Sequence, residues 1–192
     1  AEDQLSNVEK KYGSKGSSIL VRNPNNGEIY AMANSTSYNL ESPRDDKNLL
    51  KKYSQSQVNK MSEKEKTKAF NEIWKNPIVS NAFEPGSTYK PFTVAAGLEE
   101  GILKGNETYY CDGYQKVGPH TIHCSHRSGH GLITLSQSIS LSCNDALMQI
   151  AAKEGKNVFA RYQKNFNFGN NTGIDLPGEA QTASLLHDAT DM

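Results

Sequence analysis

The sequence predicts a chain of the α/β class, more specifically an α+β arrangement in which an antiparallel hairpin comes first and helices follow. Two observations predict it. An Asn-Asn-Gly turn separates two strand-like runs near the start of the chain, and helical periodicity recurs after residue 60. The 192 residues are 35% apolar, which is enough to form one domain with a core or a large part of a bigger domain.

The first predicted elements are a helix and a hairpin. Residues 3–12 have the pattern of an amphipathic helix, and residues 17–24 and 28–34 have the composition of two strands. The Asn-Asn-Gly turn at 25–27 tolerates positive φ angles and therefore favours a tight hairpin. Because a two-stranded hairpin is not stable alone, we expect further strands of its sheet elsewhere, most simply after Met192.

The rest of the chain is predicted to be mostly helical. The run over 105–131 is the exception, because it is rich in Gly, Pro, Cys and His and has little periodicity, as in a loop. The expected segments are a loop with a short helix over 35–60, then helices over 61–76, 87–101, 132–155 and 157–169.

Charge and hydropathy argue against two broad classes of function. The 21 basic and 21 acidic residues cancel, and no basic run suggests nucleic acid as a partner. No stretch approaches the roughly 20 apolar residues of a membrane span, and no signal peptide is visible. If the protein works outside the cytoplasm, we expect its membrane anchor to lie outside these residues.

A serine and a lysine lie three residues apart in the run AFEPGSTYKPFT, residues 82–93. On a helix, Ser87 and Lys90 would share one face with their Cβ atoms about 5–6 Å apart. The free N–H groups of a helix N-terminus suit a developing oxyanion, and a lysine kept from water can lose its proton and act as a base. The spacing is sufficient for nucleophilic catalysis, although a capping serine followed by a surface lysine has the same pattern.

A second motif strengthens the catalytic interpretation. Ser142-Cys143-Asn144 lies 55 residues beyond Ser87 and separates two helical segments. Ser-x-x-Lys, Ser-x-Asn and Lys-Thr-Gly together are the motif set of penicillin-binding proteins and class A β-lactamases. Taken alone, the triplet would indicate only a helix break, and Cys143 only a small buried side chain.

Three longer runs carry a family resemblance. FEPGSTYKPFT at 83–93 resembles the active-site segment of class B penicillin-binding proteins. VRNPNNGEIYAMAN at 21–34 is similar to their opening hairpin, and FGNNTGIDLPGE at 168–179 to the segment that follows their Ser-x-Asn helix. The resemblance covers the chain from about residue 3 to residue 184. It implies the serine transpeptidase (penicillin-binding) fold, an antiparallel sheet flanked by helices, with this chain as its N-terminal part.

The resemblance also implies a role for each motif residue. Ser87 would be the acylated nucleophile, and Lys90 would take its proton. Ser142 would relay a proton to the departing D-alanine, and Asn144 would hold Lys90 and the substrate amide. Cys143 would be the variable middle residue of its triplet.

The implied activity is that of a peptidoglycan D,D-transpeptidase, which cross-links stem peptides through a serine acyl-enzyme and is acylated by β-lactams. Two alternatives stay open: a β-lactam-binding sensor that acylates without turnover, and a serine β-lactamase. The implied partners are the D-Ala-D-Ala donor peptide and an acceptor amine. The implied location is the extracytoplasmic face of a bacterial membrane, with an anchor outside these residues.

One element of the family pattern is missing, because neither Lys-Thr-Gly nor Lys-Ser-Gly occurs in the 192 residues. In the family this third motif lies on a sheet-edge strand beyond the segment at 168–179. We therefore expect residues 1–192 to be an incomplete transpeptidase domain that needs the remainder of the domain for activity. The Ser-Cys-Asn triplet, with Cys111 and Cys124, is similar to sporulation-specific members of the family.

Four of the five histidines lie between residues 120 and 130, beside Cys124. We expect a structural zinc clip, because a closed zinc site takes about four N, S or O ligands and a loop with few apolar residues gains rigidity from one. In an extended chain Cys124 pairs more naturally with His126 than with His123, because neighbouring side chains point to opposite sides. The predicted ligands are Cys111, Asp112, Cys124 and His126, with His123 as the substitute.

Two alternatives to zinc stay open. Cys111 and Cys124 could instead form a disulfide, which suits an extracytoplasmic protein. The histidines could also simply solvate a loop. His130 is left out of the expected ligand set, because His130-Gly131 resembles a common family feature at the start of the next helix.

Overall fold

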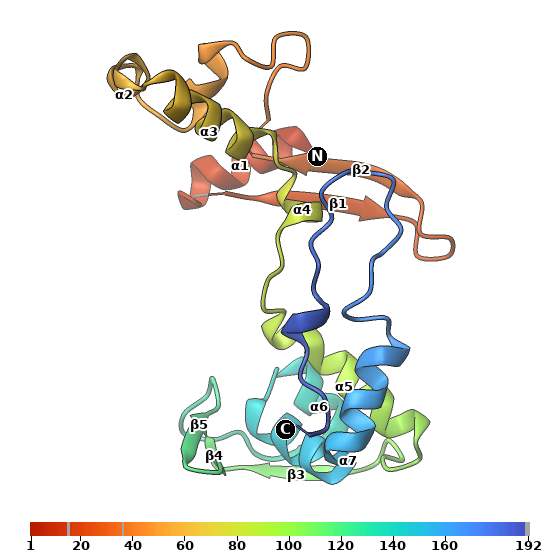
Figure 1. The fold of residues 1–192 in the computed structure, drawn as a ribbon. Coiled ribbons are helices and arrows are strands. Elements are labelled where there is room, and N and C mark those ends of the chain that lie inside the picture. The colour runs from red at the N-terminus through yellow and green to blue at the C-terminus, as the bar shows by residue number, and fades with distance from the viewer. Residues whose placement is uncertain (15, 36, 191–192) are drawn as a thin grey trace. The chain divides into compact units, whose positions relative to one another are not determined.

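The computed structural model describes residues 1–14, 16–35 and 37–190, and the chain divides into two compact units (Figure 1). Unit 1 comprises Ala1–Ala82 and Gly173–Ala180, and unit 2 comprises Phe83–Thr172 and Gln181–Met192. Within the described residues, no helix is long and apolar enough to cross a membrane.

Unit 1 opens with the predicted helix and hairpin. Helix α1 spans Glu2–Tyr12, and strands β1 (Ser18–Arg22) and β2 (Ile29–Asn34) pair antiparallel. The turn between the strands places Gly27 at φ 79°, a conformation that suits glycine, and its N–H donates to the Asn23 carbonyl at 2.9 Å. The sequence prediction of a hairpin is confirmed.

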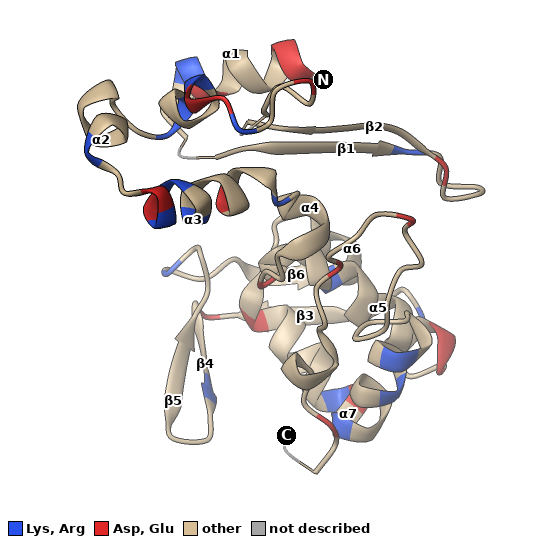
Figure 2. Cartoon of the chain, turned by 45° about the horizontal axis from the view of Figure 1, so that its top comes forward, with Lys and Arg blue, Asp and Glu red and all other residues tan. Residues whose placement is uncertain are grey.

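Four short helices follow in unit 1: η1 (Asp46–Lys51), α2 (Gln55–Lys60), α3 (Glu63–Trp74) and α4 (Pro77–Ser80). Helices α2 and α3 each begin with a capping box, in which a serine and a residue three positions later satisfy each other's backbone N–H groups. Acidic and basic residues are mixed along α3, as the colours of Figure 2 show. The buried residues of these helices form a small core of Leu49, Val58, Ala69, Phe70 and Ile73.

Unit 2 is built around two helices that lie side by side (Figure 1). The first begins as a 3-10 turn, η2 (Gly86–Tyr89), and continues as α5 (Lys90–Glu99). The second, α7 (Asn144–Asn165), follows the shorter α6 (Leu135–Ser140) and bends at Gly155, whose φ of 74° is not helical. The sequence predicted a helix ending at 155 and another beginning at 157, and the bend lies at that boundary.

The prediction of an irregular segment over 105–131 is wrong. Strands β3 (Thr108–Cys111) and β6 (Gly131–Thr134) pair antiparallel, and β4 (Tyr114–Val117) pairs with β5 (His120–His123). The helix expected to begin at residue 132 therefore begins only at α6, after β6. Strands of four residues are too short to give a readable alternation, which explains why periodicity did not reveal them.

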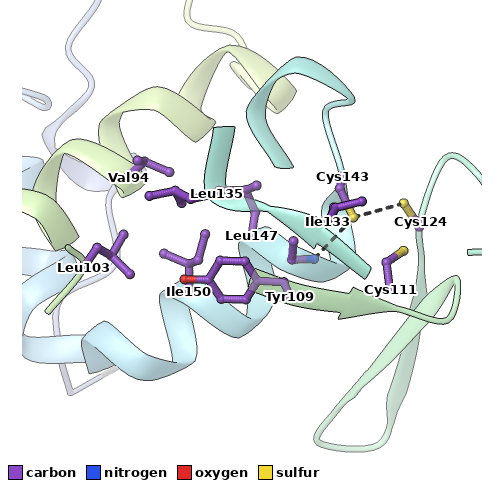
Figure 3. Close-up of a cluster of buried hydrophobic side chains, with 11 residues drawn as sticks. Val94, Leu103, Tyr109, Cys111, Cys124, Ile133, Leu135, Cys143, Leu147 and Ile150 are labelled. Atoms are coloured by element: carbon purple, nitrogen blue, oxygen red, sulfur yellow. Dashed lines mark hydrogen bonds between the residues drawn. The ribbon is translucent and has the colours of Figure 1, made fainter. Parts of the chain in front are cut away.

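The core of unit 2 lies between α5, α7 and the β3–β6 pair. Figure 3 shows three cysteine side chains at one end of this core, away from the aliphatic residues at the other end. The members of this core are Val94, Leu103, Tyr109, Cys111, Cys124, Ile133, Leu135, Cys143, Ala146, Leu147 and Ile150.

Candidate active site

The candidate nucleophile Ser87 lies in the 3-10 turn that leads into α5. Its carbonyl accepts a hydrogen bond from the Lys90 backbone N–H, which closes the turn. Side chains at positions i and i+3 eclipse each other in a 3-10 helix, so Ser87 and Lys90 share one side of this turn. Ser87 is exposed to solvent and Lys90 is half-buried.

Aromatic packing holds the turn in place. The Tyr89 ring lies between the two candidate residues in sequence and packs against Phe92, Phe159 and Phe168, with ring centroids 5.3–5.6 Å apart. Such ring contacts add to the stability gained from burial alone. Because Phe159 belongs to α7, this cluster ties the Ser87 turn to α7 beyond its bend.

Lys90 is bound to the second motif through all three of its ammonium hydrogens. Its Nζ donates to the Ser142 carbonyl at 2.6 Å, the Ser142 Oγ at 2.8 Å and the Asn144 Oδ1 at 2.7 Å. Ser142 has a φ of 51°, which is uncommon for a residue other than glycine. The helix break at this position brings both the carbonyl and the hydroxyl of Ser142 within reach of Lys90.

Asn144 is held from two sides. Its Oδ1 accepts from Lys90, while its Nδ2 donates to the His123 carbonyl at 3.2 Å. A carbonyl can only accept, so His123 requires the amide nitrogen on its side and leaves the amide oxygen facing Lys90. The loop that carries the cysteines and histidines therefore contributes directly to the orientation of Asn144.

The surroundings of Lys90 favour loss of its proton. Burial lowers the pKa of the Lys90 ammonium from its ordinary value, although the nearby thiols of Cys124 and Cys143 oppose the effect. A lysine with a lowered pKa can accept a proton from a serine hydroxyl. Lys90, Ser142 and Asn144 thus form one hydrogen-bonded group, with Ser87 one turn away on the side of Lys90.

The cysteines gather a different set of neighbours from the one expected. Cys111, Cys124, His130 and Cys143 each offer a ligand atom, and these four atoms lie within 4.8 Å of one another. Cys124 Sγ is 3.8 Å from Cys143 Sγ (Figure 3), and His130 Nδ1 is 3.5 Å from Cys111 Sγ. All three cysteines are free thiols and buried. Three thiols and one imidazole match the donor set of closed tetrahedral zinc sites.

Asp112 and His126 lie outside this group. Asp112 Oδ1 accepts from the Tyr114 N–H at 3.4 Å, and His126 Nδ1 lies 2.8 Å from the Gly129 carbonyl. In the structure, His130 and Cys143 lie beside Cys111 and Cys124, where Asp112 and His126 were expected. The sequence signals were present, because His130 belongs to the histidine cluster and Cys143 to the second motif, but neither was included among the expected ligands.

The start of α7 also acts on the thiols. Burial by itself would raise the pKa of Cys124, but backbone N–H groups of His126, Asn144 and Asp145 outweigh it and lower that pKa. Burial raises the pKa of Cys143, whose Sγ accepts from the Ala146 N–H at 3.4 Å. Cys143 therefore caps the helix that begins at Asn144.

Comparison with known proteins shows which family this chain resembles. The family model for the penicillin binding protein transpeptidase domain matches residues 17–187. Stage V sporulation protein D of Bacillus subtilis is 33% identical over 179 residues, which cover 93% of this chain and 24% of that protein. The peptidoglycan D,D-transpeptidase MrdA of Acinetobacter baumannii is 27% identical over 174 residues, covering 88% of this chain and 24% of that protein.

A solved structure shows the same fold. The peptidoglycan synthetase from Bifidobacterium adolescentis matches with a TM-score of 0.76 at 23% identity, covering 100% of this chain and 30% of that one. The mixed fold of helices and small antiparallel sheets is therefore the penicillin-binding transpeptidase fold. The chain spans about a quarter of the length of the curated relatives named above.

Proposed function

The chain belongs to the family of penicillin-binding protein transpeptidase domains, and from this premise we propose that it is part of a peptidoglycan D,D-transpeptidase. The substrates are a stem peptide ending in D-Ala-D-Ala and an amine of a neighbouring stem peptide. β-Lactams, which mimic the D-Ala-D-Ala unit, acylate the same serine. The observation that carries this proposal is the hydrogen-bonded group of Lys90, Ser142 and Asn144 beside Ser87.

The chemistry follows from the roles that these side chains can take. Ser87 Oγ attacks the carbonyl carbon between the two D-alanines and gives its proton to Lys90. A proton then passes through Ser142 Oγ to the nitrogen of the leaving D-alanine, and the C–N bond breaks. An ester now joins the donor peptide to Ser87. The acceptor amine attacks the ester carbonyl, the ester C–O bond breaks as an amide bond forms between the two stems, and a proton from the amine returns to Ser87 Oγ.

Lys90 must be neutral when it takes the proton from Ser87. Its half-buried position favours the neutral form, which is the direction in which burial shifts its pKa. Loss of one proton releases the hydrogen bond from Lys90 Nζ to Ser142 Oγ and frees a lone pair on Nζ to face Ser87. The carbonyl of Ser142 and the amide oxygen of Asn144 still accept from the remaining two hydrogens.

Labelling with a fluorescent penicillin tests the nucleophile in the full-length protein that contains this chain. We expect covalent labelling of the wild type, no labelling of Ser87→Ala, and the same melting temperature for both. Ser80→Ala is a control outside the candidate site. Labelling that persists in Ser87→Ala would overturn the nucleophile assignment. Slow release of the label, with amide formation from a stem peptide and an amine, separates a transpeptidase from a sensor and from a β-lactamase.

The proposal includes a structural zinc ion held by Cys111, Cys124, His130 and Cys143. The three buried thiols and the half-buried His130 imidazole support it, because their ligand atoms are close enough to share one ion. When bound, the ion would neutralise thiolate charge. It would also join the end of β3 and the segment between β5 and β6 to the start of α7. A site with four protein ligands leaves no position for substrate, so the role is structural.

The cellular setting follows from the proposed substrate. Stem peptides lie outside the cytoplasmic membrane, so the protein works at the extracytoplasmic face, held by an anchor outside the described residues. The identity to a stage V sporulation protein and the Ser-Cys-Asn triplet support a role in making the cell wall of a developing spore. Loss of spore wall cross-linking without a growth defect, after deletion of the gene, would be the expected phenotype.

A further inference from the structure

Asp145 is a carboxylate of unit 2 that the acyl-transfer chemistry does not use. It is fully buried, with no exposed surface, and it lies in the first turn of α7, directly after Asn144. A buried carboxylate is costly unless its oxygens accept hydrogen bonds. The donors that satisfy Asp145 therefore indicate what it holds together.

The donors come from two different segments. The Asp112 N–H donates to Oδ2 of Asp145 at 3.1 Å, and Gln115 Nε2 donates to Oδ1 at 2.7 Å. Both lie in and beside the connection between β3 and β4. Gln149, one turn further along α7, donates to the same Oδ1 at 2.7 Å and to the Tyr110 carbonyl of β3 at 2.8 Å. Asp145 thus fixes the start of α7 onto the loop that follows β3.

The β4–β5 hairpin that follows this loop also holds Asn144. His123, the last residue of β5, supplies the carbonyl that accepts from Asn144 Nδ2 at 3.2 Å. The loop after β3 and the end of β5 are joined to each other, because the Cys124 N–H donates to the Gly113 carbonyl at 2.8 Å. The first turn of α7 is therefore attached through two neighbouring side chains, Asp145 to the loop after β3 and Asn144 to the end of β5.

The position of Gly113 shows how closely this region is packed. A Cβ at Gly113 would lie 2.2 Å from the Arg127 carbonyl oxygen, and φ is 101°. The loop consequently has little freedom to follow α7 if the helix turns about its axis. A rotation of the first turn would move Asn144 away from Lys90 or from His123, since a single amide bridges both.

From this geometry we infer that Asp145 is a positioning residue for acyl transfer: it fixes the rotation of the first turn of α7 so that the Asn144 amide oxygen faces Lys90. The inference rests on the proposed function. It assigns Asp145 no contact with substrate. Catalytic groups have to be held within about 0.5 Å and 10–20° of their working geometry, so a tether of this kind affects the chemical step more than ligand binding.

The test compares three variants in the full-length protein. Gln115→Ala removes one donor from the loop side, Asp145→Asn keeps the shape of the side chain, and Asp145→Ala removes the tether. The control is Lys153→Ala on α7, whose Nζ donates to the Ile102 carbonyl at 2.9 Å. Stopped-flow acylation by a fluorescent penicillin gives the dissociation constant of the initial complex and the rate constant of acylation separately. Melting temperature and zinc content are measured on the same samples.

We expect Gln115→Ala to lower the acylation rate constant about tenfold, with the dissociation constant changed less than about twofold and the zinc content kept. Asp145→Ala should lose more. Asp145→Asn should recover part of the loss, because the Gln115 amide can turn its oxygen toward the new NH₂ group, whereas the Tyr110 carbonyl keeps the Gln149 nitrogen in place. Lys153→Ala should acylate at the wild-type rate, whatever its effect on the melting temperature.

Two results overturn the inference. One is a wild-type acylation rate constant in both Gln115→Ala and Asp145→Asn. The other is a loss of rate in Lys153→Ala as large as that in Gln115→Ala, which would show that general stability, not positioning, sets the rate. Wild-type protein that is never acylated would instead refute the proposed function together with this inference.

Discussion

Lys90 Nζ lies 2.8 Å from Ser142 Oγ, although 52 residues separate the two in the sequence. The contact forms because α5 and the Ser142 turn meet at one end of unit 2, where Lys90 also binds the Ser142 carbonyl. In the proposed mechanism, the base and the hydroxyl that relays the proton are thus already connected before substrate binds. Little reorganisation is needed for proton transfer between them.

Replacing Lys90 tests this connection. Lys90→Ala should slow acylation by penicillin by several orders of magnitude, because residues that act as a unit lose most of their effect together. Asn144→Ala should cost less, since Ser142 would still bind Lys90 through two atoms. Lys104→Ala, an exposed lysine of the same unit, is the control. Acylation of Lys90→Ala at the wild-type rate would show that Lys90 is not the base.

The motif residues could be predicted from the sequence because their spacing is local and their order is fixed. Ser87 and Lys90 lie within one turn, so a helical pattern is enough to place them on one side. The contact of Lys90 with Ser142 and Asn144 followed from the family resemblance and not from periodicity. Nothing local to either motif indicates that α5 and the start of α7 meet.

The group of three cysteines and His130 could be predicted only in part. Cys111 and Cys124 were expected to lie close together, and the structure places them at the end of β3 and directly after β5. The other partners come from a different level of structure, because β6 pairs with β3 and brings His130 close, while the break before α7 brings Cys143. These are tertiary contacts between short strands and a helix end, which spacing along the chain does not encode.

Gly97 offers a packing test of the contact between α5 and α7. A Cβ at this position would lie 2.7 Å from Glu154 Oε1 and 2.7 Å from Leu103 Cδ1, closer than side chains normally approach. Gly97→Ala should therefore lower the free energy of unfolding by about 1–3 kcal/mol. Urea denaturation of the two proteins measures the difference.

Gly16→Ala is the matched control, because its new Cβ would meet only Ser35 Oγ at an ordinary 3.8 Å. It should be neutral, or stabilising by up to about 1 kcal/mol, through reduced freedom of the unfolded chain. Equal effects of the two substitutions would mean that α5 and α7 are not packed as described.

Glu154 makes stability depend on pH. Both of its carboxyl oxygens are buried, and burial raises the pKa of this carboxyl from its ordinary value of 4.5 to about 7, although the Gly97 backbone opposes the shift. The folded state therefore holds the proton more tightly than the unfolded state. Glu154 contributes this stability fully below pH 4.5 and loses it progressively as pH rises to about 7.

Glu154→Gln removes the titration while keeping the shape of the side chain. We expect the melting temperature of the variant, relative to the wild type, to rise between pH 5 and pH 8. The sign follows because only the wild type must bury a charge at the higher pH. Glu99→Gln, on the exposed end of α5, is the control. A difference between variant and wild type that stays constant across this range would contradict the assignment.

The two ligand sets for the metal make opposite predictions for four substitutions. If Cys111, Cys124, His130 and Cys143 hold zinc, then His130→Ala and Cys143→Ser should lose most of about one equivalent of metal, because a closed site needs all four ligands. Asp112→Ala and His126→Ala should keep it. Metal analysis of protein purified without added zinc gives the answer, and a chelator should lower the melting temperature only of proteins that carry the ion. The reverse pattern of loss would restore the set expected from sequence. Less than about a tenth of an equivalent in the wild type, with a disulfide found by mass spectrometry, would refute the metal altogether, since an oxidised pair of thiols cannot supply the thiolate ligands that zinc requires.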